Sequence, residues 1–193
     1  MELEFKEKSV RHFVENKWID LREAWYTTPD GTVSGPYYTY SRKNYCVIVA
    51  TDEGGRYLCV RQYRPGLGKV TTEFPAGGIE RSGQMQYGPL NDPEQEDPLD
   101  AARRELREET GYASDDWEAL LTVPSQATMA DNYAYIFRAR NCRRVDSQHL
   151  DESEYLNVLP LAPEQLEEKI AAGDFEQAVH IMAWAYARLR EKP

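Results

Sequence analysis

The sequence contains few cysteines and histidines and no long hydrophobic run. Its three cysteines, Cys46, Cys59 and Cys142, are odd in number and widely spaced, which excludes a disulfide framework and a zinc-binding pattern. The longest apolar runs, Tyr45–Ala50 and Ile181–Ala187, are far shorter than the roughly 20 residues of a membrane helix. The first ten residues include several charged ones, whereas an export signal would have an apolar stretch there. We therefore expect a cytoplasmic protein with no membrane association.

Basic residues are also scarce relative to acidic ones. The 193 residues include 23 Lys and Arg against 33 Asp and Glu, a net charge of −10, with no dense basic block. A surface of this sign repels nucleic acid phosphates, so we expect no nucleic acid partner. A small phosphate-bearing ligand is still compatible with this charge, because a bound metal ion can supply local positive charge. The remaining composition is typical of a globular chain of one domain with at most a small extension.

The first 74 residues favour β-strands. Four segments rich in β-branched and aromatic residues are separated by turn clusters: 18–26, 37–40, 44–50 and 56–63. The last two flank a Gly-containing turn, which predicts a hairpin. From Phe74 to Asp97, repeated Gly and Pro predict a long loop.

Helices and strands mix in the second half. Pro98 at a first-turn position and Gly111 as a terminator predict a helix between them. We expect strands at 117–123, 133–139 and 155–161, and helices at 163–172 and 175–190. The fold class is therefore α+β.

The three histidines and the last helix have predicted structural roles. His12, His149 and His180 are scattered, and a lone histidine is more often structural than catalytic. In the last helix, an apolar stripe at helical spacing predicts core packing by Ala178, Ile181, Met182, Ala185 and Leu189.

The helix before Gly111 carries three clustered carboxylates. At about 100° per residue, Glu105, Glu108 and Glu109 share an arc of roughly 100°. Like charges at this spacing destabilise a helix, and carboxylates in its last turn face the negative end of the dipole. One interpretation is a solvated face neutralised by neighbouring arginines. The other is a site for Mg²⁺ or Mn²⁺, which select hard oxygen ligands.

The segment from Arg104 to Tyr112 resembles the second half of the Nudix box, G-x5-E-x7-R-E-U-x-E-E-x-G-U, where U is bulky and apolar. Every fixed position of that half is met, and Glu96 stands at the expected distance before Arg104. Gly77 matches the first glycine, but 18 residues separate it from Glu96 instead of five. We interpret this as a 13-residue insertion within 81–95.

Other segments resemble the ADP-ribose pyrophosphatase branch of that family, namely Val60–Pro65, Glu73–Gly77 and the carboxy-terminal layout. The resemblance implies a Nudix α/β/α sandwich with a mixed sheet and an additional N-terminal antiparallel sheet. In that branch the extra sheet serves dimerisation. We therefore expect a homodimer, with residues 1–42 as the β extension and 43–193 as the Nudix domain.

The resemblance also implies roles for individual residues. Glu105, Glu108 and Glu109 would bind the metal with the backbone carbonyl of Ala76, and Glu105 and Glu109 would be essential to catalysis. Arg104 would orient these carboxylates through salt bridges. In the same branch the general base comes from a loop after the box. The corresponding acids here are Glu152, assigned as the base, and Glu154, assigned as an additional metal ligand; solvated loop acids would have the same sequence.

Two arginines near the end of the segment 56–63 are candidate substrate ligands. Arg61 and Arg64 could clamp a phosphate or a ribose, since the Arg fork suits such oxygens. We expect both on one face of the strand. A surface or dimer ion pair is the alternative.

The function expected is metal-dependent hydrolysis of ADP-ribose or a related nucleoside diphosphate sugar, giving a nucleoside monophosphate and a sugar phosphate. Residues 124–133 depart from the ADP-ribose pattern, which leaves another nucleotide sugar, such as GDP-mannose, as an alternative substrate. A non-catalytic nucleotide-binding regulatory module is less favoured, because such modules often lack box glutamates and this sequence has all of them.

Overall fold

The computed structural model describes residues 2–82, 93–152 and 154–191. The chain forms two compact units. The first contains Met1–Asn44, Glu80–Gln95 and Pro124–Tyr133, and the second contains Tyr45–Ile79, Glu96–Val123 and Ala134–Pro193. The predicted division into 1–42 and 43–193 stays a prediction.

The first unit contains a three-stranded antiparallel sheet with the order β1-β2-β3. Its strands are β1 (Lys6–Glu15), β2 (Asp20–Thr27) and β3 (Val33–Ser41). β2 was expected two residues earlier at its start and one at its end (18–26), β3 was expected with shorter bounds (37–40), and β1 was not expected. All ten residues of β1 are exposed, so no apolar alternation marks it in the sequence.

The predicted insertion begins and ends in the first unit. Its central residues 83–92 lie outside the described residues. At its two ends, Arg81 and Gln95 form an antiparallel bridge, and the Ser82 N–H donates to the Glu94 carbonyl at 3.0 Å. The two ends of the segment therefore lie next to each other.

The second unit is built around an eight-stranded mixed sheet. Its main path runs β11-β5-β4-β10-β8, with β6 on β5, β7 on β4 and β9 on β10. β4 and β10 are parallel, whereas the pairs β10–β8, β11–β5, β4–β5, β4–β7 and β5–β6 are antiparallel. The strands are β4 (Tyr45–Asp52), β5 (Tyr57–Arg64), β6 (Lys69–Glu73), β7 (Ala76–Gly78), β8 (Tyr112–Ala113), β9 (Asp116–Pro124), β10 (Tyr133–Arg144) and β11 (Leu156–Leu161).

The expected hairpin of β4 and β5 is present as an antiparallel pair in the sheet, but its ladder is short. The two strands pair at Thr51 and Tyr57, next to the turn. Beyond that point β4 pairs instead with β7, where Cys46 lies opposite Gly77. This pairing brings the Gly-rich segment that follows β6 into the centre of the sheet.

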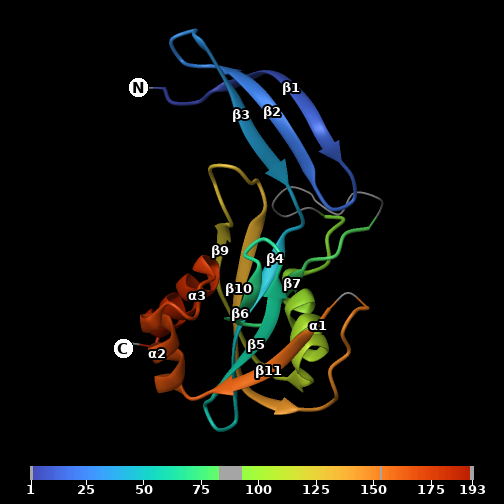
Figure 1. The fold of residues 1–193 in the computed structure, drawn as a ribbon, viewed down its shortest axis with the longest axis vertical. Helices are drawn as coiled ribbons and strands as arrows, with labels where there is room; N and C mark the ends of the chain where they lie inside the picture. The colour runs from blue at the N-terminus through green and yellow to red at the C-terminus, as the bar shows by residue number, and fades with distance from the viewer. Residues whose placement is uncertain (1, 83–92, 153, 192–193) are drawn as a thin grey trace. The chain divides into compact units, whose positions relative to one another are not determined.

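Three helices complete the second unit. Figure 1 shows α1 (Pro98–Thr110) on one side of the large sheet and α2 (Pro163–Ala172) with α3 (Ala178–Leu189) on the other. α1 has the predicted bounds. The Asp97 side chain caps its first turn, and Gly111 ends it in a left-handed conformation with φ 74°.

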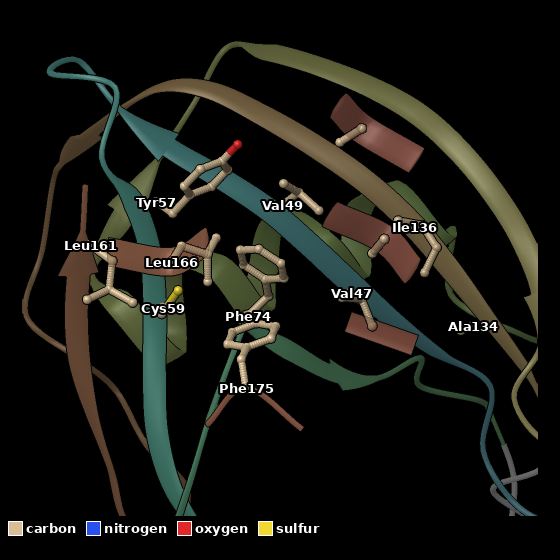
Figure 2. Close-up of a cluster of buried hydrophobic side chains, with 12 residues drawn as sticks. Val47, Val49, Tyr57, Cys59, Phe74, Ala134, Ile136, Leu161, Leu166 and Phe175 are labelled. Carbon is tan, nitrogen blue, oxygen red and sulfur yellow. The ribbon is translucent and has the colours of Figure 1, made fainter. Parts of the chain in front are cut away.

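The main core lies between the sheet and the two C-terminal helices. Val47 and Val49 of β4 pack there with Phe74 and Phe175 (Figure 2). The alternate residues of β4 face the opposite side, where Cys46 donates its Sγ–H to the Gly77 carbonyl. The predicted stripe of α3 is partly wrong: Ala178 and Leu189 are exposed, and the buried residues are His180, Ala183 and Ala187.

The architecture is therefore the predicted α/β/α sandwich with a mixed sheet and a separate N-terminal antiparallel sheet. Of the helices that the structure describes, none is at once long and apolar enough to pass through a bilayer.

Candidate active site

The buried face of α1 presents two glutamates to β7. Glu105 is 8% exposed and Glu109 is 3% exposed. The Ala76 N–H donates to Glu109 Oε2 at 3.0 Å. A Cβ on Gly77 would lie within 1.9–2.2 Å of the Glu105 carboxyl atoms, so only glycine leaves room for that carboxylate. The glycine-rich segment and the acidic helix face therefore form one site.

Arg104 links the carboxylates around this site. Its Nη1 donates to Glu105 Oε1 at 2.7 Å and to Glu108 Oε2 at 3.1 Å. Its Nε and Nη2 donate to the two oxygens of Glu96 at 3.2 and 3.0 Å, and Nη2 also reaches the Gly78 carbonyl at 3.0 Å. These contacts are those of a residue that orients carboxylates.

The site holds more negative charge than Arg104 neutralises. Burial, with the nearby charges of Glu108 and Glu154, raises the pKa of Glu105 to about 7 although Arg104 opposes the change. Burial and the charge of Glu105 raise the pKa of Glu109 well above its usual range. Both carboxylates are therefore held where their ionised forms are unfavourable unless a cation is added.

The donor set fits a divalent cation that is completed by its substrate. In the part of the chain that the structure describes, no three His, Cys, Asp or Glu side chains form a ready metal cage. Mg²⁺ usually binds one or two carboxylates and takes its remaining ligands from water and substrate phosphates. Glu105 and Glu109, buried side by side with raised pKa values, supply such hard oxygen ligands.

The acidic loop after β10 is attached to the end of α1. Gln148 Nε2 donates to the Glu109 carbonyl at 2.7 Å, and the His149 N–H donates to the Glu108 carbonyl at 2.9 Å. Glu154 is exposed, but its charge contributes to the raised pKa of both Glu105 and Glu109, so the loop brings it near them. Glu152 is also exposed. Gln148 was not expected, because its contact carries no local sequence signal.

The expectation that Arg61 and Arg64 share one face is wrong. β5 pairs with β6 from Val60 to Arg64 without a bulge, so residues three apart point to opposite faces. Arg61 is exposed. Arg64 instead forms a bidentate ion pair with Glu73, with Nε–Oε1 at 2.9 Å and Nη2–Oε2 at 2.7 Å.

Comparison with known proteins decides the family. A profile described as NUDIX domain matches residues 41–184. This chain belongs to the Nudix family. The Nudix chain is 26% identical over 190 residues to the methanol dehydrogenase activator of Bacillus methanolicus, covering 97% of this chain and 95% of that protein. It is 26% identical over 190 residues to the ADP-ribose pyrophosphatase of Bacillus subtilis, with 98% and 95% covered.

A solved structure supports the Nudix fold. A crystal structure of an ADP compounds hydrolase superposes with a TM-score of 0.77 at 19% identity, covering 97% of this chain and 95% of that one. The predicted family and fold are therefore confirmed, and the protein is a Nudix pyrophosphohydrolase. Enzymes of this family generally require a divalent metal ion.

Filling the space at Gly77 tests the geometry of the carboxylates. We expect Gly77→Ala to fold, because the Glu105 carboxylate is the far end of a flexible side chain and can move away. Its displacement should lower hydrolysis by about tenfold or more. Gly66→Ala is the control, since a Cβ there meets no atom within 4 Å. Steady-state rates and melting curves measure both effects. Equal activity of the two variants would contradict the inference that Gly77 leaves room for the Glu105 carboxylate.

Removing each arginine tests their different environments. We expect Arg64→Ala to lower the free energy of unfolding by roughly 3 kcal/mol, because it leaves the buried Glu73 carboxylate without its cation. Arg61→Ala should change it by less than about 0.5 kcal/mol, since Arg61 is exposed. Urea denaturation measures both. Equal unfolding free energies would show that the Arg64–Glu73 pair has no special role.

Proposed function

We propose that this protein hydrolyses the diphosphate linkage of ADP-ribose or a related nucleoside diphosphate sugar. One water is consumed, one bridging P–O bond breaks, and a nucleoside monophosphate and a sugar phosphate are released. The observation that carries the proposal is the pair of buried carboxylates, Glu105 and Glu109, held against β7. The similarity to an ADP-ribose pyrophosphatase over nearly the whole chain supports the substrate class.

Each acidic residue has a proposed role in this reaction. Glu105, Glu108 and Glu109, with the Ala76 carbonyl and Glu154, would hold Mg²⁺ or Mn²⁺. The bound ion would shield the diphosphate and lower the pKa of a water molecule. Glu152 is the proposed general base that takes the proton of the attacking water. Its loop is fixed to α1 by Gln148 and His149, which supports this assignment.

Arg64 is the better placed of the two proposed substrate arginines. Its charge acts on Glu109 and Glu154, so its guanidinium lies on the side of the carboxylates. Its Nη1 makes no hydrogen bond among the described residues. We assign Arg64 to a substrate phosphate, with Arg61 reaching a more distant group.

We also propose a homodimer formed through the N-terminal sheet. This unit exposes large apolar side chains that a second copy could cover, and they include Phe5, Phe13, Trp18, Tyr37 and Tyr38. The proposed location is the cytoplasm, which suits three buried cysteines that are all free thiols.

A hydrolysis screen tests the substrate. Nucleoside diphosphate sugars would be incubated with the full chain and Mg²⁺, and products would be detected as phosphate after phosphatase treatment. We expect ADP-ribose to give the highest kcat/KM. Release from GDP-mannose but not from ADP-ribose would replace the substrate while keeping the reaction class. Absence of release from every compound would favour a non-catalytic nucleotide-binding module.

A charge-removing substitution tests the role of Glu109. Glu109→Gln keeps an oxygen that can accept the Ala76 N–H but removes a negative charge from a crowded buried site. We expect turnover to fall by a factor of about 10² or more, with a melting temperature that is unchanged or higher. Glu168→Gln on the exposed side of α2 is the control. Wild-type turnover in Glu109→Gln would refute its assignment as a metal ligand.

A further inference from the structure

A buried polar cluster lies at the end of β6, beside the residues that carry the reaction. Glu73 is fully buried. Besides Arg64, its carboxylate accepts from Thr71 Oγ1 at 2.6 Å and from Gln177 Nε2 at 3.4 Å. The roles proposed above leave unexplained why the start of α3 supplies polar groups to this position.

His180 of α3 completes the cluster. It is 5% exposed, and its Nδ1 accepts the Phe74 N–H at 3.1 Å. Its Nε2 lies 3.9 Å from Glu73 Oε2. Burial lowers the pKa of His180 to about 4, although the charge of Glu73 opposes the change. The imidazole is therefore neutral at pH 7, and Nδ1 carries no proton and can accept.

The main chain bound by His180 leads directly to the carboxylates. Phe74 and Pro75 connect β6 to β7. The Pro75 carbonyl accepts from the Ile48 N–H at 2.9 Å, and the next residue, Ala76, donates its N–H to Glu109. The ring of Phe74 packs edge-on against Phe175 at 5.2 Å between centroids, which fixes the same segment from the core side (Figure 2).

We propose that His180 is a positioning residue for the hydrolytic site. Its Nδ1 fixes the main chain at Phe74 so that the Ala76 N–H meets Glu109, and its ring encloses the Glu73 carboxylate that orients Arg64. This inference rests on the proposed function for its catalytic consequence. The contacts by themselves predict that α3, on the opposite side of the sheet from α1, controls the geometry of the α1 carboxylates.

A merely structural histidine would be replaceable by any side chain that fills its volume. An apolar residue at position 180 would fill the space but leave the buried Phe74 N–H without an acceptor. That amide would then be satisfied only if the segment moved, and Ala76 lies two residues further along. The side chain of asparagine offers an oxygen at the position of Nδ1, so the two explanations predict different behaviour for Asn and Leu.

The experiment compares three variants of the full chain. His180→Leu removes the acceptor, His180→Asn retains it, and Leu166→Val trims a buried residue of the same core on α2. For each variant, kcat and KM on ADP-ribose, Mn²⁺ affinity by calorimetry, and amide exchange at Phe74 and Ala76 by NMR are measured. Melting temperatures show whether Leu166→Val matches the loss of stability in His180→Leu.

We expect His180→Leu to lower kcat by about tenfold or more, to weaken Mn²⁺ binding, and to speed exchange at Phe74 and Ala76. His180→Asn should stay within about threefold of the wild type on these measurements. The proposal is overturned if His180→Leu resembles Leu166→Val, or if Asn rescues none of these properties. If the wild type hydrolyses no nucleotide sugar, the proposed substrate is wrong, and Mn²⁺ affinity with amide exchange decides the positioning role.

A measurement on the wild type covers the case in which His180→Leu does not fold. In ¹⁵N-labelled protein, the His180 ring should be the tautomer protonated at Nε2, with a coupling across the hydrogen bond from the Phe74 N–H to Nδ1. A ring protonated at Nδ1 would overturn the proposal, because that nitrogen could not accept.

Discussion

The rest of this site depends on the electrostatic repulsion between two carboxylates that are buried side by side. Glu105 and Glu109 lie in the last turns of α1, where burial and the charges of neighbouring glutamates both act against their charged forms. The fold keeps them there by three means: a glycine that leaves them room, an amide that bonds to one of them, and an arginine that bonds to the other. A divalent cation bound here, as proposed, would offset the repulsion that remains and would attract the diphosphate of the proposed substrate.

Residues remote in sequence converge on these carboxylates from both sides of the large sheet. The loop with Glu152 and Glu154 is hydrogen-bonded to the C-terminal turn of α1, and β7 is hydrogen-bonded to Glu109 of the same helix. Behind β7, the cluster around Glu73 connects Arg64 to α3. The proposed substrate contacts and metal ligands thus share one support, which would limit the conformational freedom lost when a nucleotide binds.

The sequence allowed accurate prediction wherever a local rule was decisive. Helix α1 was predicted to the residue, because Pro98 and Gly111 have strong positional preferences at helix ends. The carboxylate cluster could be seen because helical spacing places its members on one face. Prediction failed where long-range packing decided the outcome: β1 has no buried face, most of β4 pairs with β7 and β10 and only its end with β5, and the buried side of α3 is rotated from the predicted stripe. His180 was classed as structural, since nothing local connects it to Phe74, 106 residues earlier.

The bridge between Arg81 and Gln95 has a consequence for how this Nudix chain can change in evolution. Because the two ends of the insertion are held together, extra residues between them cost only the entropy of a longer closed loop, which grows slowly with length. Glu96 and α1 follow directly after the bridge, so a change in the length of the segment need not move them. Evolution could therefore lengthen, shorten or rewrite this segment while Glu96 and α1 kept their places in the fold.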